Sequence, residues 1–474
     1  MIHWAYDKRW LLIAFALGFG LLLMPVPSGL TLPGWKVLVM TLCATVLFIK
    51  EPVPLPSVAL LIILGQILLL GIDSSTVAGS LMKDSVLFIM GSLMLAVALV
   101  KQHLDKRLAL VIVRFTGSNA YRIAFGLSVV SGLLASFVGE HTVAAMMLPV
   151  ALTLVQLAEK DEERRRRLAI LFLFSISYAC CMAGIGTPSG GARNAIMIDY
   201  WREFFVKPGD PATAIFDVSY TRWMLFAYPV FIVQIPLMHW VLKKTCHAPK
   251  EDLTRAVRQL KVQVGREGAM QGRHYVAIAL FIATLFSWIF LSSYVGMGTV
   301  AVAGAAAFLV TGLVRWQDLN SGVNWGVVLL YGAAISLGQQ MQATGAAGWV
   351  AGRFLDLLSP IGLGTGAGLL AAIMLLTTAL TNTMSNGAAV AVLGPVVLSI
   401  AVEAGINPLA AGFVTALASS FAYFTVIGTP ASTIVHSSGY LAGPDFMRVG
   451  WRLGGMSFVI LMLFATLYWP LLGA

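Results

Sequence analysis

Apolar runs of the length that crosses a lipid bilayer recur from one end of this 474-residue chain to the other. A helix needs about 20 apolar residues to cross the hydrocarbon core of a membrane. Eleven runs approach this length, while two further apolar stretches, 121–158 and 363–403, are too long for one crossing and short for two. The eleven runs are 10–25, 36–49, 55–72, 84–100, 168–205, 222–244, 275–293, 297–314, 323–341, 407–438 and 446–471.

The composition excludes the soluble classes of protein. Hydrophobic residues make up 58% of the chain and charged residues only 11%, whereas ordinary soluble domains have about 25% charged residues. A soluble enzyme, a disordered chain or a nucleic-acid-binding protein would need far more polar surface. The sequence therefore predicts an all-α polytopic membrane protein whose main partner is the lipid bilayer and which binds no nucleic acid.

The basic residues indicate how the chain crosses the membrane. They cluster in short loops, including the run Arg164–Arg167 and the loop 243–274. These loops are cytoplasmic if the N-terminus is cytoplasmic and the stretch 121–158 enters and leaves the membrane on one face. We therefore expect a re-entrant hairpin there, in a multi-pass protein of a bacterial inner membrane. The segment 101–118 mixes basic and apolar residues, which predicts an interfacial helix before the hairpin.

Two motifs occur once in each half of the chain. GEHTVAAMMLP (139–149) and SNGAAVAVLGP (385–395) both lie inside a long apolar stretch and end in proline, and GIGTPSGG (184–191) matches VIGTPAST (426–433). Proline removes an intrahelical hydrogen bond and glycine loosens the helix, so each Gly-Thr-Pro predicts an unwound span. The freed backbone groups can attract ions. One such segment could be a simple kink, but two at matched positions favour a binding site.

The motifs define an internal repeat in which Gly91 and Gly332 occupy similar places before the two hairpins. An odd number of crossings separates the two units, so their topology is inverted. Inverted repeats with broken helices point to a secondary transporter that binds its ligand near the membrane midplane. The predicted parts are N-terminal scaffold helices (1–83), a first repeat (84–205, with hairpin 121–158 and a broken helix at 184–191), linking and scaffold helices (206–322, with the basic loop 243–274), a second repeat (323–438, with hairpin 363–403 and a broken helix at 426–433) and a C-terminal helix (439–474).

Through these hairpin tips and Gly-Thr-Pro segments the chain resembles the divalent anion:sodium symporter family, which carries dicarboxylates, citrate and sulfate. The resemblance covers most of the chain. That family has Ser-Asn-Thr at each hairpin tip, where substrate carboxylates and sodium ions bind. The resemblance implies a homodimer whose transport domain moves as an elevator against a scaffold domain. It also implies secondary active transport of a small organic or inorganic divalent anion, coupled to Na⁺ and/or H⁺.

The two tips of this chain depart from the family motif to different degrees. The second tip (385–387) keeps Ser385 and Asn386, but Gly387 stands where the family has threonine. Thr381, one turn earlier, matches a sodium-site position of the family. In the first tip (139–142), counting back from the proline places the motif on Gly139-Glu140-His141, and a slip of one residue places it on Glu140-His141-Thr142.

Ionisable residues inside a membrane span are costly and are functional candidates by default. Glu140 and His141 lie in such a stretch. Glu140 could hold a cation by its charge, or take up a proton in place of one sodium ion. His141 could donate to an anionic oxygen. The alternative is a Glu–His pair that only satisfies itself.

Arg193 follows the first Gly-Thr-Pro, and its planar guanidinium suits carboxylate or sulfate oxygens. It could instead snorkel toward the membrane surface, or pair with Asp199 or Glu140, while His436 is interpreted as structural. The predicted substrate-binding residues are His141, Thr142, Thr187, Pro188, Arg193, Asn386, Gly387, Thr429 and Pro430. The predicted cation-binding or coupling residues are Gly139, Glu140, Gly186, Thr381, Ser385, Asn386 and Gly428, with Na⁺ expected at Thr381 and Asn386.

Other functions remain open at this stage. A cation/proton antiporter without an organic anion would use Glu140 as its exchanging site. A membrane-embedded enzyme would need a metal constellation, a phosphate loop or a nucleophile motif, and none is recognisable in the sequence. We therefore expect no catalytic residue and no cofactor beyond the coupling ions. A passive channel would not require two breaks at inverted positions.

Overall fold

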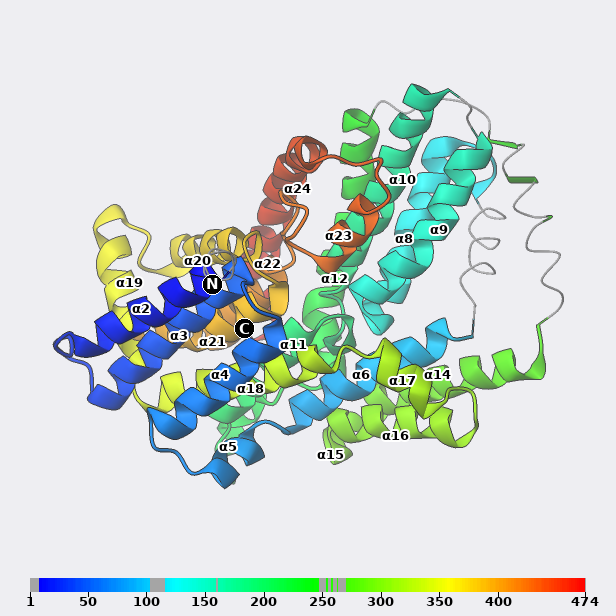
Figure 1. Ribbon diagram of the computed structural model, residues 1–474. Coiled ribbons are helices and arrows are strands. Elements are labelled where there is room, and N and C mark those ends of the chain that lie inside the picture. The colour runs from blue at the N-terminus through cyan, green and yellow to red at the C-terminus, as the bar shows by residue number, and fades with distance from the viewer. Residues whose placement is uncertain are drawn as a thin grey trace.

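The computed structural model describes residues 8–102, 116–158, 161–246, 253–254, 257–258, 262 and 270–473. These residues are organised in helices, with no strand element among them, which confirms the predicted all-α class (Figure 1). Within the described part of the chain, eight helices are long and apolar enough to cross a membrane, and up to eleven spans result if three bent helix pairs each count as one. Residues 103–115 of the predicted interfacial helix 101–118 and much of the basic loop 243–274 lie outside the described residues.

From residue 8 onward, where the structure describes the chain, four helices precede the first repeat. Thr31 caps the second of them, because its side chain accepts from the backbone N–H of Gly34. The first two helices pack on each other, and the third packs on the first helix of the second repeat. The four helices are α2 (Arg9–Leu23), α3 (Leu32–Lys50), α4 (Leu55–Leu68) and α5 (Ser74–Ser80).

The first repeat contains a helical hairpin that turns at a single glycine. Gly139 has a φ of +96°, a conformation that residues with a side chain rarely adopt. The two arms of the hairpin pack on each other and on the helix that follows them. The helices are α6 (Asp84–Val100), α8 (Ala120–Val138), α9 (Glu140–Ala158), α10 (Glu162–Ala183), the 3₁₀ turn η1 (Pro188–Gly190) and α11 (Ala192–Phe205).

The second repeat contains a hairpin that turns through residues 382–385. Ser385 caps its second arm by accepting from the backbone N–H of Ala388 at 3.4 Å. The segments Ala346–Ile361 and Gly366–Thr381 are bent by 120° relative to each other. The helices are α18 (Trp325–Ala343), α19 (Ala346–Leu358), the 3₁₀ turn η3 (Ser359–Ile361), α20 (Gly366–Thr381), α21 (Asn386–Glu403), α22 (Pro408–Ala418) and α23 (Pro430–His436).

The two hairpins share a register. Helix α9 begins at Glu140 and α21 begins at Asn386, and each contains one proline, Pro149 or Pro395, nine residues further on. Glu140 therefore takes the structural place of Asn386. This agrees with the alignment counted back from the prolines, rather than with the alignment shifted by one residue.

Each repeat also contains an interrupted helix. The first break (184–191) separates α10 from α11, and the second break (419–429) separates α22 from α23. The second break begins upstream of the segment 426–433 expected from the sequence and overlaps it only over 426–429, because Pro430 is the first residue of α23. Proline is favoured there, since its missing N–H is not needed in the first turn. Thr187 and Thr429 have nearly the same backbone dihedrals, φ −133° with ψ 159° and φ −136° with ψ 150°.

The repeats exchange elements across their boundary. The second arm of the first hairpin, α9, packs against α23 of the second repeat, and the second arm of the second hairpin, α21, packs against α11 of the first repeat. Figure 1 shows α8, α9, α10 and α23 grouped in one bundle and α19, α20 and α21 in another. The crosswise contacts place both hairpin turns and both breaks in the region between the bundles.

The remaining helices link the repeats and close the chain. α6 lies so close to one of them that a Cβ on Gly91 would be 2.6 Å from Ala301, and a Cβ on Gly332 would be 2.7 Å from the Leu81 carbonyl oxygen. Both glycines thus permit close helix packing. The linking helices are the 3₁₀ turn η2 (Pro211–Phe216), α12 (Tyr220–Thr245), α14 (Gly272–Phe290), α15 (Ser292–Val295), α16 (Met297–Val310) and α17 (Trp316–Gly322), and α24 (Gly443–Leu463) continues as a π turn (Phe464–Tyr468) and a 3₁₀ turn (Trp469–Leu472).

Candidate functional site

A cavity of about 720 Å³ lies between the two repeats, and both hairpin tips line it. The tips are in direct contact, since the side-chain amide of Asn386 donates to Oε1 of Glu140 at 3.2 Å. The cavity wall also includes residues of the first break and the start of α23. Ten of the predicted site residues line it, namely Gly139, Glu140, His141, Thr142, Pro188, Arg193, Ser385, Asn386, Gly387 and Pro430.

A buried ion pair joins the first tip to the first helix after the break. Nη1 of Arg193 lies 3.5 Å from Oε1 of Glu140, and the two side chains are 2% and 9% exposed. Nε and Nη2 of Arg193 and Oε2 of Glu140 have no hydrogen-bond partner among the described residues. A buried charge needs partners to offset its desolvation. The free N–H groups of this guanidinium therefore favour a second anion at the cavity wall.

Glycines of the first break make room for the Arg193 guanidinium. A Cβ on Gly184 would lie 2.6 Å from Nη2, and a Cβ on Gly191 would lie 2.8 Å from Nη1. The backbone freed by the break is partly satisfied by Asn194, whose amide donates to the carbonyl oxygens of Gly184 at 2.8 Å and Thr187 at 2.7 Å. The guanidinium and one asparagine thus occupy the polar interior of this break.

The second tip gathers neutral oxygen atoms instead. Oγ1 of Thr381 lies 2.8 Å from Oδ1 of Asn386 and 2.5 Å from the carbonyl oxygen of Ser419, the first residue of the second break. A threonine hydroxyl has one proton, so it can donate to only one of these acceptors. Hard cations prefer oxygen ligands of this kind. The residues around Thr381 therefore fit a sodium ion, with the hydroxyl, amide and carbonyl oxygens as ligands.

Five predicted site residues lie behind the cavity wall and join its parts. Thr187 donates its hydroxyl to the carbonyl oxygen of Ser136 in the first hairpin. Oγ1 of Thr429 lies 3.2 Å from Sγ of Cys181 on α10. The five residues are Gly186, Thr187, Thr381, Gly428 and Thr429, none of which is part of the cavity lining.

The structure distinguishes among the ion-pair partners that the sequence left open for Glu140 and Arg193. Glu140 is paired with Arg193 rather than with His141, which lies exposed on the cavity wall. Asp199, another partner considered for Arg193, instead accepts from the Ser85 hydroxyl at 3.0 Å. Arg193 is fully buried, so it does not extend toward the membrane surface.

Tyr331 is a site residue that the sequence motifs do not reveal. It lines the cavity from α18, and a Cβ on Gly387 would lie 2.4 Å from its Cε1 atom. Gly387 therefore gives the tyrosine ring its space. Ser189 was missed as well; it lines the cavity and its hydroxyl lies 2.8 Å from the Tyr220 hydroxyl. The only local clue to Tyr331 was the glycine that replaces threonine in the second tip.

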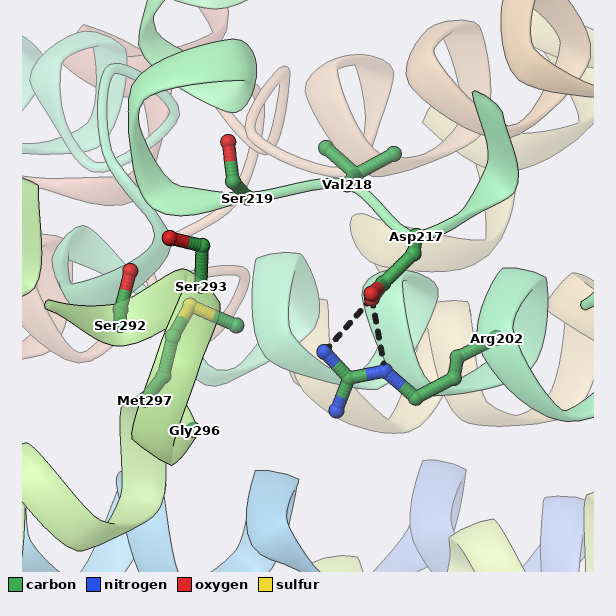
Figure 2. A pocket seen from close by; sticks show the side chains of 8 residues that line it. All are labelled: Arg202, Asp217, Val218, Ser219, Ser292, Ser293, Gly296 and Met297. Carbon is green, nitrogen blue, oxygen red and sulfur yellow. Dashed lines mark hydrogen bonds and ion pairs between the residues drawn. The ribbon is translucent and has the colours of Figure 1, made fainter. Parts of the chain in front are cut away.

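A second pocket, of about 360 Å³, contains none of the predicted residues (Figure 2). Its cationic group is Arg202, whose guanidinium points at Asp217, with Nε and Nη2 2.9 and 2.8 Å from Oδ1. Nη1 also lies 3.6 Å from a carboxylate oxygen of Asp84. Because this guanidinium is already paired, the pocket between the hairpin tips is the better candidate site.

Two hairpins whose tips meet beside two interrupted helices define a membrane protein of the broken-helix repeat type, with its ligand site between the halves. The family described as "Sodium:sulfate symporter transmembrane region" matches residues 6–474. The chain belongs to this family. It is accordingly a membrane transporter and not an enzyme.

Several relatives match nearly the whole chain. The sodium-dependent high-affinity dicarboxylate transporter 3 of Caenorhabditis elegans is 26% identical over 482 residues, covering 91% of this chain and 83% of the relative. The sodium-dependent dicarboxylate transporter SdcS of Staphylococcus saprophyticus is 24% identical over 471 residues, covering 93% and 87%. The crystal structure of the Alcanivorax borkumensis YdaH transporter has a similar fold, with a TM-score of 0.56, 14% identity and coverage of 84% and 88%.

Proposed function

We propose that this protein is a secondary active transporter that moves a small dicarboxylate-like anion across the membrane, with Na⁺ as its driving ion. The observation that carries the proposal is the buried Arg193 guanidinium, whose Nε and Nη2 nitrogens have no hydrogen-bond partner among the described residues, beside a cavity lined by both tips. Its relatives named as sodium-dependent dicarboxylate transporters support the same substrate class.

The cavity matches this substrate class in size and chemistry. Small-molecule sites typically have volumes of about 300–1,000 Å³, and this cavity has about 720 Å³. Arginine recognises carboxylate through parallel N–H groups. We assign one carboxylate of the substrate to Arg193, and the other to the neighbourhood of Asn386, His141 and Thr142, which line the same cavity.

We assign Na⁺ to the second tip, where Thr381, Asn386 and the Ser419 carbonyl bring three oxygen atoms together. Asn386 also donates to Glu140, so the cation site shares a residue with the cavity wall. A shared residue provides coupling, because each ligand then helps to complete the site of the other. Glu140 offers a second route, in which H⁺ contributes to the driving force.

The proposal includes a transport cycle and an assembly. The two hairpins are re-entrant, the repeats have inverted topology, and the hairpins with their broken helices move as an elevator against a scaffold. The protein functions as a homodimer in a bacterial inner membrane, with a cytoplasmic N-terminus. The crosswise packing of α9 with α23 and of α11 with α21 supports a common motion of these elements.

Uptake of radiolabelled succinate by proteoliposomes tests the proposed function. An inward Na⁺ gradient should drive accumulation, and replacement of Na⁺ by K⁺ should abolish it. Accumulation driven by a pH gradient alone would assign the coupling to H⁺. Exchange of Na⁺ for H⁺ without uptake of succinate or sulfate would identify a cation/proton antiporter and overturn the proposal. Empty liposomes are the control.

A further inference from the structure

We infer that Arg193 provides, as a permanent part of the protein, the positive charge that the second tip takes from a free sodium ion, so that the first tip binds no sodium ion. The inference rests on the proposed function, because it assigns the ions of the same site. It begins from the equivalence of the two halves of that site.

The equivalence places a charged residue opposite a neutral one at two positions. Glu140 and Asn386 are each the first residue of the second hairpin arm, nine residues before a proline. Arg193 stands six residues after Thr187, and the residue six positions after Thr429 is Val435, which is buried and apolar. The acidic Glu140 and the basic Arg193 therefore both belong to the first half, and the second half has neutral residues at the equivalent positions.

The charges of the first half occupy the space where an ion would otherwise lie. A Cβ atom built on Gly184 would lie 2.6 Å from Nη2 of Arg193, 3.2 Å from the carbonyl oxygen of Gly190 and 3.3 Å from Oε2 of Glu140. The guanidinium, a backbone carbonyl oxygen and a carboxylate oxygen thus border one small space beside Gly184. The carbonyls of Gly184 and Thr187 already accept from Asn194.

The second half leaves the corresponding chemistry incomplete. The hydroxyl of Thr381 faces two acceptors, Asn386 Oδ1 and the Ser419 carbonyl oxygen, with one proton between them. A free cation would satisfy both acceptors, because several oxygen atoms can coordinate one cation without needing a proton between them. In the first tip a fixed cation is already present, since the Arg193 guanidinium stands beside Oε1 of the Glu140 carboxylate.

Electrostatics also separates the two halves. A sodium ion placed beside Arg193 would meet a like charge in a buried region, where interactions between charges are much stronger than in water. An anion in the cavity would instead lie between one fixed cation in the first half and one exchangeable cation in the second. The fixed charge would attract the anion without contributing an ion to the transport cycle.

Equilibrium binding of radioactive sodium to the purified full-length protein, without any anion, tests the inference. The wild type should bind one sodium ion per chain, and Thr381→Ala should bind none at the same concentration. Arg193→Met exposes the Glu140 carboxylate and should raise the count to two. Arg193→Lys preserves a tethered charge and should keep the count at one.

Two results would overturn the inference: a wild type that binds two ions, or a Thr381→Ala variant that still binds one. Neither measurement uses Arg193→Met, so the two results test the inference even if that variant does not fold. The double variant Thr381→Ala/Arg193→Met should retain one ion, in the first tip. Failure of the wild type to transport succinate or sulfate would sink the proposed function, whatever the sodium count.

Discussion

The first hairpin turns at one glycine and places a glutamate at the start of its second arm, whereas the second hairpin turns through 382–385 and places an asparagine there. Both halves then have a proline at the same distance along the second arm, and a threonine of matching dihedrals directly before the proline of the Gly-Thr-Pro segment. Charge is thus concentrated in one half of a symmetric frame. The comparison shows that the frame fixes where ligands lie, while a few side chains fix which ligands they are.

Removal of the Arg193 guanidinium, which distinguishes the first half from the second, should have the largest effect. Arg193→Ala leaves the Glu140 carboxylate buried without its partner, and loss of one member of a buried pair costs about 3–5 kcal/mol. We expect a large loss of thermal stability in Na⁺-free buffer, partial recovery with Na⁺, and no succinate uptake. Thermal unfolding of the purified protein and proteoliposome uptake are the measurements.

The double variant Glu140→Gln/Arg193→Ala is the matched control, because it removes both charges together and should recover most of the stability. Equal destabilisation of the single and the double variants would show that the unpaired Glu140 carboxylate is not the cause of the loss.

Removing an oxygen atom from the second tip should have the next largest effect. Thr381→Ala deletes the hydroxyl beside Asn386 and Ser419, so the Na⁺ concentration needed for half-maximal thermal stabilisation should rise at least about tenfold, or about 1.4 kcal/mol. Thr377→Ala is the control, since this buried threonine lies on the same helix and donates to its own helix backbone, at the Ile373 carbonyl. A similar shift in both variants would argue against a cation at Thr381.

The glycines of the two tips should respond differently to a methyl group. Gly387→Ala places a Cβ against the Tyr331 ring, and such overpacking costs about 1–3 kcal/mol. Replacing the Tyr331 ring by a smaller side chain, in Tyr331→Leu, should restore the stability of Gly387→Ala. Gly139→Ala should resist any such rescue, because its cost comes from the backbone angle. Thermal unfolding of the single and double variants separates steric from conformational cost.

An ion pair at the protein surface gives the smallest effect and a reference for the buried one. The Lys101 ammonium lies 2.8 Å from the Asp318 carboxylate, and together with the Arg315 backbone N–H it lowers the pKa of Asp318. A lowered pKa in the folded state adds stability above the ordinary pKa of about 3.9, and this is lost as the pH falls through the folded value. Asp318→Asn should therefore be slightly less stable than the wild type at neutral pH, and equally stable in strong acid. A difference that persists in acid would exclude this cause.

The sequence was sufficient to locate the residues of the site, but not to predict which of them contact one another. Proline spacing and the Gly-Thr-Pro segments identified both tips, and ten of the chosen residues line one cavity. The partner of Arg193 stayed open between Glu140, Asp199 and an anion, because 53 positions along the chain separate the pair that the fold brings together. Tyr331 and Ser419 carry no motif of their own, and only helix packing places them at the second tip.

The start of the second break illustrates the same limit. Proline and glycine mark where a helix must yield, but a helix can end earlier when other groups satisfy its last carbonyls. Here the carbonyls of Ser419 and Phe421 accept from Thr381 and Asn382 of the hairpin. Such tertiary hydrogen bonds are absent from any local pattern of residues.

The exchange of α9 and α21 between the repeats has a consequence for how the molecule folds. Half of this chain, cut between the repeats, would hold one hairpin and a broken helix that each lack their packing partner. Neither half can complete its share of the cavity wall alone, so the site forms only after both repeats have been made.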